Sequence, residues 1–207
     1  MKANTLKKKS KRYFDSIAEN QEIIEEPALC YDIVLRKLEK AESIGALADI
    51  SCGTGEMLRR VFDRCGEETE LYGVDLSEKS IASARRKLPG NVNLQAGDVD
   101  DLPLQDECVD VALNMHSFHH YPYPIHALEE IRRILKSSGT FYLVENNYKG
   151  LRRRYINFRI KTMGHFQGDI KMYSRRELDT MLLKSGFTII DREEIADHSV
   201  LYTCRKG

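Results

Sequence analysis

From Ala46 onward, short apolar runs typical of strands alternate with amphipathic patterns typical of helices, and this alternation restricts the fold more than any other feature. The strand-like runs lie at 46–50, 71–74, 92–96, 108–113, 140–144, 187–191 and 199–204. The helical patterns lie at about 54–64, 77–88, 123–136 and 174–185. Strands that alternate with helices predict a mostly parallel sheet with helices on both faces. The last two runs, joined by a short polar turn, predict an antiparallel pair at one edge.

The residues before the first strand predict an N-terminal segment at 1–42, with a basic arm and helices that cap the main domain. The main domain is expected at 43–207. Residues 1–12 are polar and basic without periodicity, so we expect a mobile arm or a frayed helix start. Residues 13–24 predict a short amphipathic helix, and Pro27 suits the first turn of a second one.

Composition describes an ordinary globular protein. The 207 residues include 32 Lys and Arg against 32 Asp and Glu, and 42% are hydrophobic. No apolar stretch approaches the roughly 18 residues of a membrane span, and the basic start is not followed by the apolar block of a secretory signal. The five cysteines are odd in number and lack a CxxC spacing, which favours reduced thiols and a cytoplasmic protein.

A glycine turn follows the first strand, with the sequence Ser51-Cys52-Gly53-Thr54-Gly55, and leads into a helix. Such a turn lets a ligand approach the backbone closely at the positive end of a helix, although glycine also serves turn geometry alone. The second strand ends at Asp75, at the separation from the glycines that suits an acceptor for ribose hydroxyls. The third strand ends at Asp98. Ligands of open α/β sheets bind at this edge, so the acids predict a nucleotide site.

The same motif excludes two classes of nucleotide site. A dinucleotide fingerprint requires GxGxxG, but Leu58 stands at the position of the third glycine. The phosphate-loop pattern GxxxxGK[ST] is absent from the sequence. A ligand that carries a ribose and no pyrophosphate therefore fits better.

These segments resemble a known family. ALADISCGTGEML, LYGVDLS, LQAGDVDDLP and DVALNMHSFHHYPYPIHALEEIRRILKSSGTFYLVE are similar to successive motifs of class I S-adenosylmethionine-dependent methyltransferases, in the branch with ubiquinone- and menaquinone-biosynthesis enzymes, the methyltransferase-11-like branch. The resemblance covers about 46–145. It implies a Rossmann-like seven-stranded sheet of order 3-2-1-4-5-7-6, with the last strand antiparallel, and S-adenosyl-L-methionine as cofactor.

By this resemblance, the cofactor would be held by residues at the ends of the first four strands. They are Asp49, Ser51, Cys52, Gly53, Thr54, Gly55, Asp75, Leu76, Asp98, Val99 and Asn114. Asp49 and the 51–55 turn would hold the methionine end, and Asp75 the ribose. Leu76, Asp98 and Val99 would surround the adenine, and the Asn114 carbonyl would accept from the ammonium.

Two positions leave alternatives open. Ser51 replaces the first glycine of the family motif, so its hydroxyl either bonds the methionine carboxylate or weakens cofactor binding; we expect binding to be retained. Tyr13 and Phe14 resemble an aromatic pair that lies over the cofactor in this branch. A helix that packs its aromatic face on the core is the alternative.

Histidines follow the fourth strand at His116, His119 and His120. Transfer of a methyl group needs a general base only where the acceptor must lose a proton, and imidazole titrates near neutral pH. His119 and His120 are therefore the candidates for a base, against the alternative of a loop that only packs beside the cofactor. His116 and His120 are four positions apart, which suits a metal only on a helix, and Pro122 and Pro124 favour a loop; no metal site is predicted.

The segment 146–173 is long for a loop and carries six basic residues at 149–161 without an acid. One interpretation is a basic, lid-like insertion that selects an anionic or aromatic substrate, or binds RNA. The other is an amphipathic helix with Leu151, Tyr155 and Phe158 packed inward. Because residues 1–12 and 149–161 concentrate the positive charge, the neutral total does not exclude a nucleic-acid partner.

The sequence thus predicts an enzyme that methylates a small molecule. The alternatives are a methyltransferase acting on RNA or protein, and a non-catalytic domain that binds S-adenosylmethionine.

Overall fold

The computed structural model describes residues 3–19, 28–40, 44–164, 168–195 and 198–207. Its centre is a seven-stranded sheet of order β3-β2-β1-β4-β5-β7-β6, which confirms the predicted order. The strands are β1 (Ala46–Ile50), β2 (Glu70–Asp75), β3 (Asn93–Ala96), β4 (Val109–Met115), β5 (Leu135–Asn146), β6 (Phe187–Ile195) and β7 (Ser199–Lys206). β7 runs antiparallel to both its neighbours, and the other described pairs are parallel.

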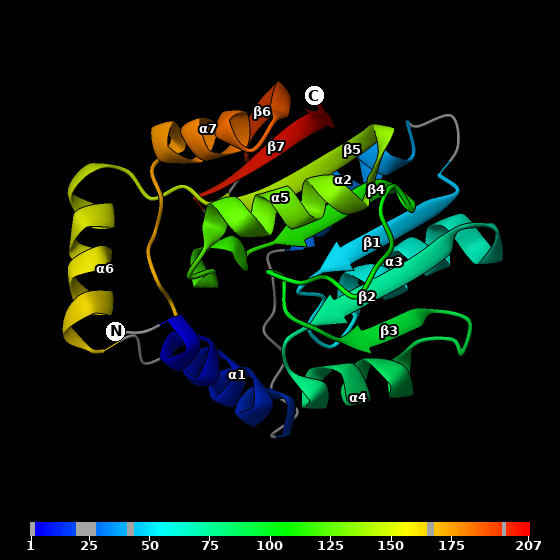
Figure 1. Ribbon diagram of the computed structural model, residues 1–207, viewed down its shortest axis with the longest axis horizontal. Helices are drawn as coiled ribbons and strands as arrows, with labels where there is room; N and C mark the ends of the chain where they lie inside the picture. The colour runs from blue at the N-terminus through cyan, green and yellow to red at the C-terminus, as the bar shows by residue number, and fades with distance from the viewer. Residues whose placement is uncertain (1–2, 20–27, 41–43, 165–167, 196–197) are drawn as a thin grey trace.

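Helices cover both faces of the sheet, as predicted. They are α1 (Ala3–Glu19), α2 (Ala28–Leu38), α3 (Glu56–Cys65), α4 (Glu78–Lys87), α5 (Pro124–Ile134), α6 (Gly150–Thr162) and α7 (Arg175–Lys184), with short 3-10 turns at Gly66–Glu68 and Phe118–His120. Buried residues of α5 and α7 share one core with the sheet, and those of α2, α3 and α4 share the other. Figure 1 shows α1 and α6 apart from these layers, at the end of the molecule to which β1 and β2 point.

The central strands read as almost continuous apolar runs because both of their faces are buried. In β1, Ala46, Ala48 and Ile50 belong to the core under α5 and α7, whereas Leu47 belongs to the opposite core. This pattern is expected of a parallel sheet with helices on both sides.

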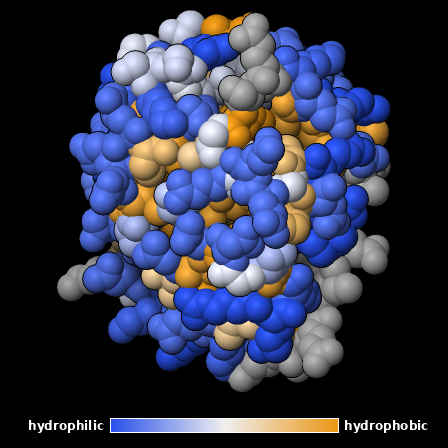
Figure 2. Space-filling view, turned by 90° about the vertical axis from the view of Figure 1, so that its right-hand side faces the viewer, coloured by the Kyte–Doolittle hydropathy of each residue, from blue (hydrophilic) through white to orange (hydrophobic). Residues whose placement is uncertain are grey.

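The parallel register places the polar strand ends at one edge. Asp49 in β1 pairs with Gly73 in β2 and with Leu113 in β4, and Asp75 in β2 pairs with Ala96 in β3. The opposite end of the molecule, viewed in Figure 2, is covered largely by hydrophilic residues with apolar residues between them. Among the described residues, none of the helices has the length and apolar character needed to cross a bilayer.

Of the two interpretations of residues 1–12, a mobile arm or a frayed helix start, the described part agrees with a helix start, since one helix, α1, runs from Ala3 to Glu19. Some of its basic side chains are engaged: Lys7 pairs with Asp98, and Lys9 donates to the Gly164 carbonyl at 2.6 Å. The rest of the predicted 13–24 helix, and Pro27, lie outside the described residues.

The inward packing expected for the basic insertion is wrong. Leu151 on α6 is 82% exposed, and Tyr155 and Phe158 are 59% and 62% exposed, whereas Ile160 is buried. Apolar residues are spread around α6, so no single face of the helix can bury them all. Because apolar residues occur on more than one side of α6, the periodicity of the sequence alone does not show which side packs on the protein.

The capping box expected at the start of α7 is present. The Ser174 side chain accepts from the Glu177 backbone N–H, and the Glu177 carboxylate accepts from the Ser174 N–H at 2.8 Å. Together they satisfy two backbone donors that the first turn of a helix leaves unpaired.

We expect Ser174→Ala to lower the free energy of unfolding by about 1 kcal/mol, because it removes the side-chain acceptor of the cap. The measurement is urea denaturation followed by circular dichroism. Thr180→Ala on the same helix is the control, since the exposed Thr180 hydroxyl only donates to the Arg176 carbonyl of its own helix. Equal stability of wild type and Ser174→Ala would contradict the capping role.

Candidate functional site

A cavity of about 490 Å³ lies at the carboxyl edge of the sheet. This volume is within the range of about 300–1,000 Å³ that is typical of small-molecule sites. Nine of the eleven predicted cofactor residues line it: Asp49, Ser51, Cys52, Gly53, Thr54, Asp75, Leu76, Asp98 and Val99. The structure therefore brings together residues from the ends of three strands, as the spacing of the motifs predicted.

The other two predicted residues, Gly55 and Asn114, are not among the lining residues. Gly55 precedes α3 with φ of +81°, and a Cβ at this position would lie 2.6 Å from Leu88 of α4. Its absence of a side chain therefore serves the packing of α3 against α4. The Asn114 side chain is completely buried and lies behind the cavity wall.

The turn after β1 is held to the end of β2. The backbone N–H groups of Ser51 and Cys52 both donate to the Val74 carbonyl, at 2.7 and 3.1 Å. Ser51 adopts φ of +64°, a left-handed conformation that favours glycine and is strained for serine. Gly53 has φ of +54°, and a Cβ built there meets no atom within 4 Å, so the space beside its backbone is open to a ligand.

Asp75 ties this turn to the second strand. Its Oδ2 accepts from the Gly53 N–H at 2.9 Å, and its Oδ1 accepts from the Ser77 N–H at 2.8 Å. Burial raises the pKa of the Asp75 carboxyl, although these two N–H donors oppose the shift. The Ser77 hydroxyl in turn donates to Asp15 of α1 at 2.5 Å, which joins the N-terminal helix to the site.

Asp98 is held by the same helix. The Lys7 ammonium lies 2.6 Å from Asp98 Oδ2 and 2.5 Å from Asp100 Oδ2. Burial acts to lower the pKa of Lys7, but the hydrogen bonds to Asp100 and Asp98 outweigh it and the pKa is raised. Lys7 therefore remains a cation that balances two neighbouring carboxylates at the rim of the cavity.

The strained Ser51 is linked to a buried hydroxyl network. Its Oγ lies 2.7 Å from the Tyr121 hydroxyl, which lies 3.2 Å from Ser117 Oγ. The Asn114 amide nitrogen is within hydrogen-bond distance of Tyr121, of Ser117 and of the Ile50 carbonyl. Burial raises the pKa of the Tyr121 hydroxyl, which stays protonated near neutral pH. This network fixes the Ser51 side chain at the position of the family glycine.

His119 is oriented by a buried carboxylate. Its Nδ1 lies 2.8 and 3.0 Å from the two oxygens of Glu145, whose Oε2 also accepts from the His119 backbone N–H at 2.9 Å. Burial acts to raise the pKa of Glu145, but the neighbouring His119 and hydrogen bonding outweigh it, so the pKa lies below its usual range. An ionised Glu145 fixes the imidazole with Nδ1–H toward the carboxylate and Nε2 as an acceptor.

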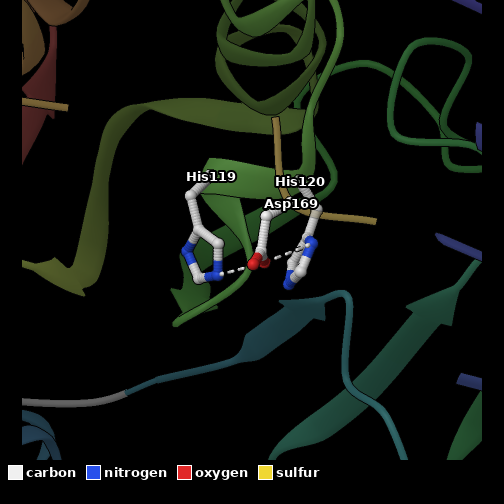
Figure 3. A group of neighbouring side chains, drawn as sticks. All are labelled: His119, His120 and Asp169. Carbon is white, nitrogen blue, oxygen red and sulfur yellow. Dashed lines mark ion pairs between the residues drawn. The ribbon is translucent and has the colours of Figure 1, made fainter. Parts of the chain in front are cut away.

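The Asp169 carboxylate lies between the imidazoles of His119 and His120 (Figure 3). Its Oδ1 lies 3.6 Å from His119 Nε2 and 3.4 Å from His120 Nδ1, and all three residues line the cavity. The segment that carries Asp169 is fixed by the Ile170 N–H, which donates to the His119 carbonyl at 2.8 Å. Burial, followed by the effect of His119, lowers the pKa of His120 to about 3, so this imidazole is neutral near pH 7.

The aromatic pair of α1 lines the same cavity. The Phe14 ring packs edge-on against His120, with 5.1 Å between ring centroids, and Tyr13 packs against Phe14. This position agrees with the aromatic cover implied by the resemblance rather than with packing on the core. His116 also lines the cavity, and burial lowers its pKa.

Three residues that the sequence did not single out belong to this site: Lys7, Glu145 and Asp169. The sequence could have indicated Glu145, because this acid lies near the end of a strand as Asp75 and Asp98 do. No sequence pattern indicates Lys7 or Asp169, because only the folding of remote segments brings these two residues to the cavity. No residue of α6 is among the lining residues, although Tyr148 before it and Asp169 after it are.

The residues of the cavity fit S-adenosylmethionine. Five carboxylates and one ammonium are found among the described lining residues, which suits a ligand with a sulfonium and an ammonium: Asp49, Glu56, Asp75, Asp98 and Asp169 against Lys7. The open space beside the Gly53 backbone provides the close approach that such a ligand requires.

Comparison with known proteins gives an independent line of evidence. A family model described as "Methyltransferase domain" matches residues 48–143. Demethylmenaquinone methyltransferase of Staphylococcus aureus is 26% identical over 199 residues, which cover 92% of this chain and 78% of that protein. The "Probable phthiotriol/phenolphthiotriol dimycocerosates methyltransferase 2" of Mycobacterium ulcerans is 33% identical over 125 residues, or 58% of this chain. The chain spans about half the length, 47%, of this protein and of a 37.1 kDa transposon protein of Streptomyces fradiae.

Solved structures share the fold. A methyltransferase in complex with the Haloferax volcanii Trm112 methyltransferase activator superimposes with a TM-score of 0.77 at 23% identity, covering 93% of this chain and 97% of that one. A SAM-dependent methyltransferase of Aquifex aeolicus gives 0.73 at 19% identity, with 93% and 98% covered. At these identities the likeness establishes the architecture.

We expect Tyr121→Phe to lower the free energy of unfolding by about 1–3 kcal/mol, because it leaves buried polar atoms of Asn114 and Ser51 without this hydroxyl. Thermal and urea unfolding measure the change. Tyr123→Phe is the matched control, since Tyr123 is exposed and its stacking with Lys7 needs only the ring. If both variants are as stable as the wild type, the network does not support the turn.

Proposed function

We propose that this chain, which shares a methyltransferase domain and the fold of S-adenosylmethionine-dependent methyltransferases, is a class I enzyme that transfers the methyl group to a small-molecule acceptor by in-line displacement. S-Adenosylmethionine is the cofactor, and when bound it supplies a sulfonium whose methyl group is already activated. The remaining tasks belong to the chain's own residues. They must align the acceptor, exclude water and take up any proton that the acceptor loses.

The observation that carries this proposal is one cavity that is lined by nine of the predicted cofactor residues and by His119, whose imidazole is held from behind by the buried Glu145. Residues of α1 line it, among them Tyr13, Phe14 and Ile17, so the helix covers the site. A covered cavity of about 490 Å³ suits an acceptor that enters whole, which favours a small molecule over a large RNA or protein surface.

The cofactor residues follow the family pattern. Asp75 would bind the ribose hydroxyls, and Leu76 and Val99 would flank the adenine. Asp98 would accept from the adenine amino group, and in doing so it would share its carboxylate with Lys7. Ser51, held by Tyr121, would present its hydroxyl to the methionine end.

His119 is the proposed proton acceptor, ahead of His120. The Glu145 carboxylate binds Nδ1–H of His119, so Nε2 of the same ring points away from Glu145. The carboxylate also stabilises the imidazolium that would form when Nε2 takes a proton from an acceptor hydroxyl, phenol or amine. The low pKa of His120 makes it a poor base near neutral pH. The buried Glu145 is thus a positioning residue, and His119 is the residue that would touch the acceptor.

RNA is the second candidate substrate, because α6 carries exposed basic and aromatic side chains. Several of these charges are already engaged: Lys149 pairs with Glu194 at 2.9 Å, Arg153 with Glu177 at 3.4 Å, and Arg152 lies beside His198. Engaged charges release fewer counterions on binding a phosphate backbone, which favours the small-molecule acceptor.

The test combines calorimetry with S-adenosylmethionine and its demethylated product with transfer of labelled methyl groups. The acceptors are a panel of phenols, quinols and amines, and separate pools of RNA and of protein. We expect binding of both cofactor forms and label in a small molecule. Binding of neither form at millimolar concentration would refute the enzyme, and label only in RNA, with salt-dependent affinity, would favour the second candidate.

We expect Asp75→Ala to weaken binding of S-adenosylmethionine at least tenfold, because a charge-assisted hydrogen bond contributes about 1.5–3 kcal/mol and tenfold in Kd is about 1.4 kcal/mol. Isothermal calorimetry provides the Kd. The control is Asp32→Asn on the exposed face of α2, which should bind as the wild type does. An unchanged Kd for Asp75→Ala would overturn the ribose assignment.

We expect Glu145→Gln to lower kcat about tenfold or more with little change in KM, because it removes the charge that stabilises the His119 imidazolium. The assay uses the acceptor from the panel that is labelled fastest, over a range of pH. A structural role alone would reduce the folded fraction, which circular dichroism detects, and would not alter the pH profile. An unchanged kcat would exclude His119 as the base.

A further inference from the structure

His119, His120 and Asp169 bring three metal-binding atoms together from two remote segments (Figure 3). His119 Nε2 and His120 Nδ1 lie 3.6 and 3.4 Å from Asp169 Oδ1, and the three ligand atoms all lie within 4.8 Å of one another. The two histidines follow each other in a 3-10 turn, and Asp169 comes from the strand-free segment after α6. Two imidazoles and one carboxylate are a common ligand set for transition-metal ions.

The two separations that involve Asp169 match those of ligands around one ion. Zinc binds imidazole nitrogen and carboxylate oxygen at about 2.0–2.2 Å, so two ligands of a tetrahedral ion lie about 3.4 Å apart. The distances of 3.4 and 3.6 Å in this cluster are longer than the usual 2.7–3.2 Å of a hydrogen bond, and they agree with a shared ion.

The second shell of the cluster has the form found around metal-binding histidines. Such histidines almost always donate their other ring N–H to a carboxylate or carbonyl, which fixes the tautomer and directs the lone pair to the metal. Glu145 accepts from His119 Nδ1 at 2.8 Å and is fully buried. With neutral imidazoles, Glu145 and Asp169 give the cluster two negative charges, which a divalent cation balances.

We propose that His119, His120 and Asp169 form a binding site for one first-row divalent transition-metal ion, with Zn²⁺ as the best-matched ion. The site contributes three protein ligands, and because all three residues line the cavity, its remaining positions face the space available to an acceptor. A bound ion would polarise an acceptor oxygen and lower the pKa of its hydroxyl. With the ion bound, His119 Nε2 is a ligand, and the acceptor proton would pass to solvent instead.

The sequence predicted no metal because it compared only His116 with His120. The 3-10 turn directs His119 instead toward the shared carboxylate, and Asp169 is fifty residues away in the chain. The proposal does not depend on methyl transfer, since it concerns the binding of an ion by this chain alone.

The test is a calorimetric titration with Zn²⁺ of the full chain after dialysis against EDTA. We expect one equivalent to bind with a Kd in the micromolar range or below, and Asp169→Asn and His120→Gln to weaken it at least tenfold. His126→Gln is the control, because the His126 side chain is 57% exposed. A loss of Zn²⁺ binding in this variant would indicate binding at a surface histidine. Absence of saturable binding, or equal Kd values for Asp169→Asn and His126→Gln, would overturn the proposal.

A second measurement needs no substitution. Imidazole nitrogen signals of the ¹⁵N-labelled wild type should move for two histidines on addition of one equivalent of Zn²⁺. Unchanged histidine signals would refute the site even if the variants fail to fold. The result is independent of the cofactor, so a chain that binds Zn²⁺ without transferring methyl groups would contradict the proposed function alone.

Discussion

The parallel register of β1, β2, β3 and β4 is the constraint on which the site depends. Parallel strands that pair over most of their length must end at a common edge, so the side chains that follow them converge whatever their distance in sequence. Asp75, Asp98 and the Ser51–Gly55 turn meet in this way. β5 extends the same edge and delivers Glu145 and Asn146 to the histidine side of the cavity.

Buried carboxylates at that edge are stabilised in two different manners. Asp75 receives two backbone N–H groups and keeps a raised pKa, so its charge is only partly compensated by the chain itself. Glu145 receives an imidazole and backbone N–H groups, and its pKa is lowered despite complete burial. A carboxylate whose charge is incompletely compensated suits a ligand contact, whereas one that is fully compensated suits the orientation of a neighbour. This difference agrees with the proposed division of the cavity into a cofactor side at Asp75 and an acceptor side at His119.

The sequence was sufficient for the sheet because its central strands are buried on both faces and the helices that pack on it carry one apolar face. The capping box at Ser174 and the acids that end β2 and β3 were equally readable, since each depends on local chemistry. Lys7 and Asp169 could not be found in this way, because their roles come from long-range packing of α1 and of the segment after α6. The orientation of α6 also escaped prediction: Leu151, Tyr155 and Phe158 share one helix face, but that face is exposed and the buried Ile160 lies on the opposite one, which only the packing of the rest of the chain decides.

The net charge of the chain is zero, and part of the compensation of charge is found at α1. Two of its lysines face acidic groups of the chain: Lys7 contacts Asp98 and Asp100, and Lys11 lies 3.5 Å from Asp15 and 3.8 Å from Glu78. The basic N-terminal helix and the acidic strand ends therefore act as opposite charges that hold the cover on the site. In the proposed cofactor site, Lys7 of α1 and the adenine would both use the Asp98 carboxylate. Lys7, Lys9 and Lys11 of this basic segment thus contact groups of the same chain, whereas Lys8 and Arg12 are exposed.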